Sequence, residues 1–169
     1  MSFTNLRFFL DKNQSHGQKD EFLRQFLLRL NLCRPLENLD AWQFSSYIQK
    51  SVIIIFHKIK NFKILIINKF DLYCSKEQNE YIKDTINVHQ QNLDSRHRLI
   101  FIYLTDDLDS GNILGYQLIE NQKLIEFLQW RAEIEIREWL ESCAEILEED
   151  NLFKRHLNSY IRELKIITN

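Results

Sequence analysis

The sequence predicts an α/β protein in which helices flank a mixed β-sheet and the C-terminal part is helical. Two β-branched runs, 51–58 and 62–70, indicate a pair of strands, and the run 97–105 indicates a third. Segments with apolar residues at a 3.6-residue period precede and follow these runs. The resulting order of helix, strands, helix, strand and helices is typical of a sheet covered by helices.

The first half of the chain begins with an amphipathic helix, expected over 19–32, where Phe22 and Phe26 lie on one apolar face. The segment that contains Pro35 should end this helix, because proline cannot continue it. The aromatic residues of 36–50 allow a strand there. The two β-branched runs that follow predict an antiparallel hairpin buried on both faces, since neither shows the alternation of a half-exposed strand.

The second half is expected to be mainly helical. A helix should start at Ser75, and the third strand, 97–105, comes after it. The segment 120–149 has helical spacing with a break near Trp130, and a last helix follows residue 151.

Length and composition favour one folded domain over residues 1–169. With 44% hydrophobic and 27% charged residues, the composition is that of a globular protein and excludes an intrinsically disordered one. The three cysteines are widely spaced and form no CxxC pair, which argues against a disulfide framework or a zinc site. The apolar runs are too short to span a bilayer. We therefore expect a cytoplasmic protein without a membrane segment.

The charge balance bears on the class of partner. With 22 basic and 24 acidic residues the formal charge is −2, so no broad basic field would attract nucleic acid. A DNA contact would need a local cluster such as 96–98 or 154–156, and such short clusters are more commonly solvated faces. A protein partner is the favoured expectation, and the sequence does not indicate an oligomeric state.

Several stretches resemble a bacterial branch of the PD-(D/E)XK nuclease superfamily. They are the opening "LDKNQSHGQKDEFLRQFL", the hairpin, "IFIYLT", and the tail "WLESCAEIL" followed by "YIRELKIIT". The resemblance implies a restriction-endonuclease-like fold. It also implies a catalytic signature with an aspartate on one strand and Glu-x-Lys on the next. The two carboxylates of that signature hold Mg²⁺, and the lysine positions the attacking water. Glu and Lys share a face because alternate side chains of a strand do so.

Laid on this chain without gaps, the signature keeps its lysine and loses both acids. Lys69 takes the position of the catalytic lysine, Ile67 that of the glutamate and Ile53 that of the aspartate. Isoleucine cannot bind Mg²⁺, so the usual metal site cannot form in this register. Lys69 is then a vestige of the site or a surface lysine at the end of a strand.

Other residues could belong to such a site. Gln78 matches a glutamine on the helix after the motif, although Ser75 and Gln78 also have the spacing of a helix capping box. Glu21 could serve as an auxiliary acid or be a solvated helix glutamate. Asp71 with Glu77 or Glu80 could rebuild a metal site from relocated carboxylates.

The resemblance therefore implies a degenerate nuclease-like protein with a binding or regulatory function. The expected context is a bacterial defence system, an immunity or toxin–antitoxin pair, or a subunit beside an active nuclease. No cofactor is expected on this interpretation. The alternative is an active Mg²⁺-dependent deoxyribonuclease that uses the relocated carboxylates.

Overall fold

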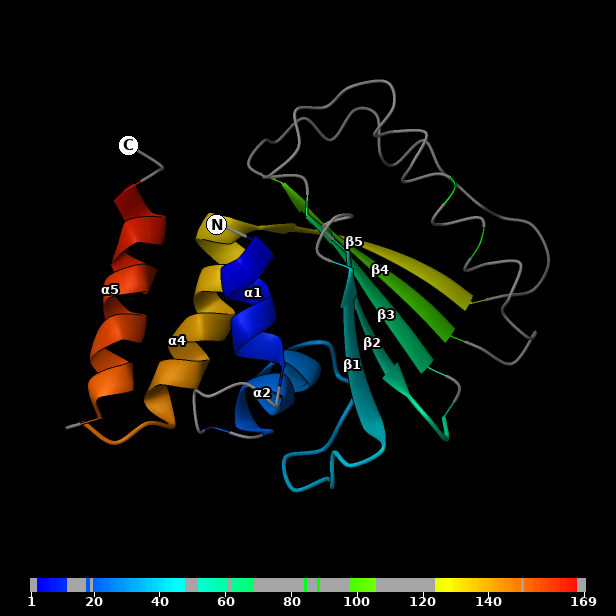
Figure 1. Ribbon diagram of the computed structural model, residues 1–169, viewed down its shortest axis with the longest axis horizontal. Helices are drawn as coiled ribbons and strands as arrows, with labels where there is room; N and C mark the ends of the chain where they lie inside the picture. Colours follow the sequence, from blue (N-terminus) through cyan, green and yellow to red (C-terminus); the bar gives the residue numbers. More distant parts are fainter. Residues whose placement is uncertain are drawn as a thin grey trace. The chain divides into compact units, whose positions relative to one another are not determined.

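The structure, a computed structural model, describes residues 3–11, 18, 20–47, 52–60, 62–68, 84, 88, 98–105, 124–149 and 151–166. Its elements (Figure 1) are α1 (Phe3–Leu10), α2 (Glu21–Arg29), β1 (Trp42–Tyr47), β2 (Val52–His57), β3 (Phe62–Asn68), β4 (Arg98–Thr105), β5 (Leu124–Arg131), α4 (Arg137–Glu145) and α5 (Leu152–Ile166). A π-helical turn, Ala132–Ile136, connects β5 to α4. The mixture of strands and helices confirms the predicted α/β class.

The chain forms two compact units. One combines Met1–Asp40 with Trp130–Asn169 and contains α1, α2, α4 and α5, and the other is Ala41–Gln129 and contains β1 to β4. We call them the helical unit and the sheet unit. A single domain over the whole chain stays a prediction.

The sheet is mixed, as the sequence predicts. β1 pairs with β2, and β2 with β3, in antiparallel fashion, whereas β3 pairs with β4 in parallel. β5 lies next to β4, so the strands follow one another across the sheet in sequence order (Figure 1). The predicted strands at 36–50 and 97–105 are therefore present as β1 and β4.

The β2–β3 hairpin is buried on both faces, in agreement with the prediction. On β2, Ile53 and Ile55 are inaccessible to solvent, and on β3 the same holds for Ile64 and Leu65. Each such side chain stabilises the fold by about 1.5–3 kcal/mol relative to an exposed position. The continuous apolar sequence is thus explained by a strand pair with no solvent-facing side.

His57 fixes the turn of this hairpin. Its Nδ1 accepts hydrogen bonds from the backbone N–H groups of Ile59 and Lys60, at 3.1 and 3.0 Å. The imidazole is buried, and its ring centroid lies 5.0 Å from that of Trp42 in an edge-on contact. This side chain gives the turn the acceptor that its backbone donors require.

The helical unit has an aromatic core. Helix α2 buries Phe22 and Phe26, and Trp139 of α4 packs edge-on against Phe26 with ring centroids 5.6 Å apart. The indole N–H of Trp139 donates to the carbonyl of Phe22 at 3.1 Å. Phe153 of α5 also contacts Phe22, at 5.8 Å between centroids. Three helices distant in sequence are thereby joined.

Helix α2 ends earlier than the predicted stop at Pro35. Asn31 adopts a left-handed conformation with φ of 55° and donates its N–H to Leu28 O. The N–H of Leu32 reaches Leu27 O. These two bonds form a Schellman motif, which asparagine tolerates better than most residues.

The prediction of helix throughout 120–149 is wrong in its first part. Residues Leu124–Arg131 form β5, and the helix begins only after the π-helical turn. A short apolar run such as "LIEFLQW" fits either period, and pairing with β4 decides in favour of the strand. The predicted break near Trp130 does mark the point where the strand gives way to helix.

Helix α1 was not expected from the sequence, whereas α5 confirms the predicted last helix. Most of the helix predicted from Ser75 lies outside the described residues, but Asp84 and Val88, which are described, are helical.

Candidate functional site

The hairpin register shows how the positions of the resembled catalytic signature are arranged. Val52 pairs with Ile67, and Ile53 pairs with Ile66. Directly paired residues of an antiparallel ladder point to the same face. Ile67 therefore shares its face with Val52 and Ile54, while Ile53 points to the opposite face.

This arrangement corrects the gapless alignment. Two acids at Ile53 and Ile67 would lie on opposite sides of the sheet and could not bind one metal ion. The alignment counted residues along each strand but had no information on how the two strands pair. The positions that could face a metal together with Ile67 are Val52 and Ile54.

The absence of acids on the hairpin does not depend on this register. Neither β2 nor β3 contains an aspartate or glutamate at any position, as their sequences VIIIFH and FKILIIN show. Four consecutive residues of each strand, 52–55 and 64–67, are buried and aliphatic. Every alignment of these paired strands thus leaves both faces without a carboxylate ligand.

The remaining predicted site residues fall into two groups. Glu21 is the first residue of α2, and its Oε1 lies 3.3 Å from Nε of Arg24, one turn further along the helix. That ion pair favours its interpretation as a helix-surface residue. The other candidates lie outside the described residues: Lys69, Asp71, Glu77, Gln78 and Glu80.

Lys63 is a residue that the sequence reasoning missed. It lies on the face of Ile67, where the register pairs it with Phe56 and Leu99. Its side chain is half-buried, and this burial lowers the pKa of the ammonium group below its ordinary value. The sequence feature that could have identified it is a lysine at the second position of a strand whose next four residues are aliphatic.

Metal-ligating side chains are not gathered elsewhere in the described part of the chain, where no three His, Cys, Asp or Glu residues lie close enough to hold an ion. Cys143 is buried, and burial raises the pKa of its thiol, so it remains a neutral core residue. The described helices include none that is long and apolar enough to cross a bilayer.

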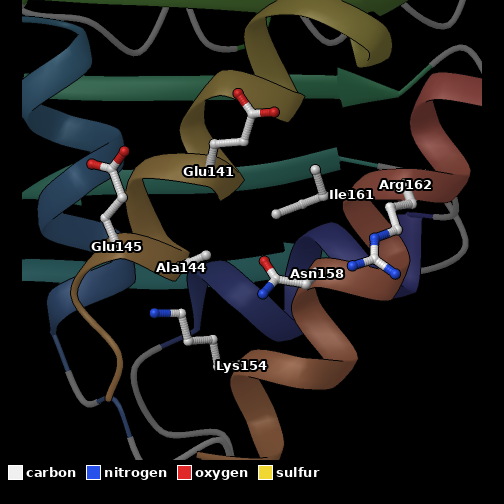
Figure 2. Close-up of a pocket in the computed structure, with 7 residues that line it drawn as sticks. All are labelled: Glu141, Ala144, Glu145, Lys154, Asn158, Ile161 and Arg162. Carbon is white, nitrogen blue, oxygen red and sulfur yellow. The ribbon is translucent and has the colours of Figure 1, made fainter. Parts of the chain in front are cut away.

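A groove between α4 and α5 is a second candidate site, within the helical unit (Figure 2). Its volume is about 470 Å³, in the range of small-ligand clefts. The α4 wall carries Glu141, Ala144 and Glu145. The α5 wall carries Lys154, Asn158, Ile161 and Arg162.

Two of these charged residues already have partners. The ammonium of Lys154 donates to Leu147 O at 3.0 Å and to Glu149 Oε1 at 2.6 Å. Glu141 pairs with Arg137 at 3.6 Å. The predicted basic cluster 154–156 therefore has one of its cations neutralised, which weakens it as a phosphate-binding surface.

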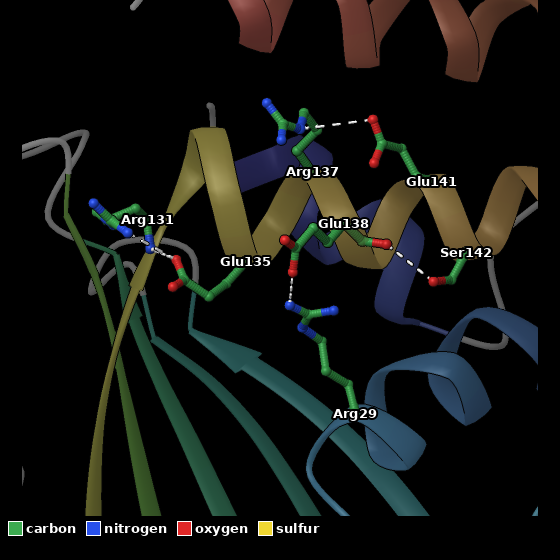
Figure 3. A network of polar contacts seen from close by, with 7 residues as sticks. All are labelled: Arg29, Arg131, Glu135, Arg137, Glu138, Glu141 and Ser142. Atoms are coloured by element: carbon green, nitrogen blue, oxygen red, sulfur yellow. Dashed lines mark hydrogen bonds and ion pairs between the residues drawn. The ribbon is translucent and has the colours of Figure 1, made fainter.

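A chain of polar contacts runs along the start of α4 (Figure 3). The Glu135 carboxylate accepts the backbone N–H of Arg131 at 2.6 Å, and Glu138 forms an ion pair with Arg29 of α2. The guanidinium of Arg29 also lies 6.0 Å from the ring of Trp130. These contacts attach α4 to α2 and the π-helical turn to the end of β5, so the network is structural.

No family model matches the sequence, and no curated protein or solved structure matches it.

Proposed function

We propose that this protein is a catalytically degenerate relative of the PD-(D/E)XK nucleases, with a restriction-endonuclease-like fold, that acts by binding a protein partner. The observation that carries the proposal is the β2–β3 hairpin, which presents buried aliphatic side chains on both faces and no carboxylate. In the resembled enzymes, the paired strands at this place hold the metal-binding acids.

The sheet is compatible with this proposal. The strand that ends in the Asn-Lys stretch pairs with a preceding antiparallel strand, as the two-strand catalytic signature requires. Metal-dependent hydrolysis needs ligands that clamp the phosphate and activate water. A hairpin of buried aliphatic residues supplies neither, so in this proposal the hairpin is a scaffold and another surface of the protein binds the partner.

A protein partner is favoured over nucleic acid because of the charge. The chain has a formal charge of −2, and Lys154 of one predicted basic cluster is bonded to Glu149. Arg98 of the other cluster lies over the ring of Phe62, at 5.2 Å from its centroid. We place the protein in the cytoplasm, in a defence or immunity pair or beside an active nuclease.

A cleavage and binding experiment tests the proposal. Purified protein is incubated with linear, supercoiled and single-stranded DNA in Mg²⁺ or Mn²⁺, next to Lys69→Ala and Asp71→Asn variants. We expect no cleavage by any of the three proteins. We also expect DNA affinity, measured by fluorescence anisotropy, to be weak at physiological salt.

Two results would overturn the proposal. Cleavage by the natural sequence that disappears in Asp71→Asn would establish an active nuclease with relocated carboxylates. Tight DNA binding with a steep salt dependence would identify nucleic acid as the partner.

A further inference from the structure

The α4–α5 groove has walls of opposite charge. Glu141 and Glu145 lie one turn apart on α4, and Arg162 and Lys154 lie on α5 (Figure 2). The floor between them contains Ala144 and Ile161, which are 6% and 5% exposed. The groove is thus an apolar strip bordered on α4 by an acidic wall and on α5 by a basic wall that consists of Arg162 and of Lys154, whose ammonium is already bonded to Glu149.

Such a surface is complementary to itself. Consider a second copy laid face to face on the first and related to it by a two-fold axis that runs along the groove, in the plane of contact. This axis places the α4 wall of each copy opposite the α5 wall of the other. The acidic wall of each copy then lies against the basic wall of the other. An axis across the groove would instead place acid against acid, so the charges select the first orientation.

We propose that the groove between α4 and α5 is the contact surface of a two-fold symmetric homodimer. The two helical hairpins form a four-helix bundle in which α4 of one copy neighbours α5 of both copies. All neighbouring helices are antiparallel in this arrangement, as in up-and-down bundles. The proposal does not depend on whether the hairpin has lost catalysis.

Individual residues support a second copy as the occupant. Arg162 and Glu145 are exposed, and neither forms an ion pair within the described part of the chain. Arg162 can therefore pair with the acidic wall of the other copy. At the connection of α4 and α5, Ile146 and Leu152 are 42% and 66% exposed. The same axis brings the α4–α5 connections of both copies, which carry these exposed apolar residues, to the same end of the assembly.

Sedimentation velocity of the full chain, over a range of concentrations and salt, tests the proposal. We expect a monomer–dimer equilibrium whose Kd rises with salt, because rim charges contribute to it. Arg162→Glu should weaken the dimer by about 10- to 100-fold, since two symmetry-related contacts are reversed. Adding Glu141→Lys to Arg162→Glu should restore much of the affinity.

Arg155→Glu is the matched control, because Arg155 is an exposed arginine of α5 that does not line the groove. It makes the same charge change and should leave Kd within about twofold. Circular dichroism confirms that each variant is folded. A protein that stays monomeric at all concentrations would overturn the proposal. Arg155→Glu weakening the dimer as much as Arg162→Glu, or no recovery in the double variant, would do so too.

Discussion

The sheet unit and the helical unit use different side chains to hold together. The sheet unit buries mainly aliphatic residues, together with Trp42 and Phe101, and the buried polar side chain in its described part is His57, at the end of β2. The helical unit packs Phe22, Phe26 and Trp139 against one another and joins α2 to α4 through Arg29 and Glu138.

The difference bears directly on function. The hairpin that resembles a catalytic element carries no carboxylate on either strand. Two exposed charged side chains, Glu145 and Arg162, instead line the groove between α4 and α5.

The largest effect is expected in the helical unit, from Trp139→Ala. The substitution leaves a cavity among aromatic rings and removes the donor to Phe22 O. It should lower the free energy of unfolding by about 3–5 kcal/mol, measured by denaturant titration. Trp139→Phe, which keeps a ring and loses the N–H, should cost clearly less. Equal losses in the two variants would mean that packing at Trp139 contributes little.

The matching test of the sheet unit is His57→Leu. The variant retains bulk but leaves the N–H groups of Ile59 and Lys60 without their acceptor. A loss of about 1–3 kcal/mol in thermal or chemical unfolding is expected. His57→Asn is the control, because an asparagine oxygen can accept from the backbone two residues on. If Asn costs more than Leu, the hydrogen bonds do not explain the role of His57.

A pair of carboxylates introduced on the hairpin tests which positions share a face. Val52→Asp with Ile67→Glu places both acids side by side, whereas Ile53→Asp with Ile67→Glu places them on opposite faces. If the variants fold, Mn²⁺ at ten times its Kd should raise the free energy of unfolding of the Val52→Asp/Ile67→Glu variant by about 1.4 kcal/mol. The second pair should show no shift in Tm with Mn²⁺. A shift only in the second pair would contradict the register.

The smallest effect is expected from Lys63→Met. Burial lowers the pKa of Lys63 from its ordinary 10.5, so the unfolded chain binds more protons between the lowered value and 10.5. Stability of the natural protein should therefore rise with pH in that window. Lys63→Met should be slightly more stable than the natural protein at neutral pH, with the gain shrinking toward pH 10.5. Lys58→Met, at the exposed turn, is the control, and a destabilised Lys63→Met would contradict the assigned burial.

Much of the fold follows from the sequence, because strand signals in 51–58, 62–70 and 97–105 and the apolar face of α2 are strong and local. The strand β5 could not be distinguished from helix, since its pairing with β4 is a long-range contact. Helix α1 is a single eight-residue element without an acidic first turn, so its start was not visible.

The candidate site was less predictable than the fold. That the hairpin strands carry no carboxylate follows from their sequences alone. Whether Ile53 and Ile67 point to the same face of the sheet depends on the pairing register, and a shift of one residue would reverse the answer. The α4–α5 groove joins residues from two separate helices, and its acidic and basic walls emerge only when these pack together. The lowered pKa of Lys63 likewise depends on neighbouring strands.

Isothermal titration calorimetry of Mn²⁺ into the natural protein tests the central claim most directly. A hairpin without carboxylates predicts no stoichiometric binding, and the same flat titration in Asp71→Asn and in Glu77→Gln. Binding of one Mn²⁺ per chain that Asp71→Asn or Glu77→Gln abolishes would show that a metal site persists, and would contradict the account.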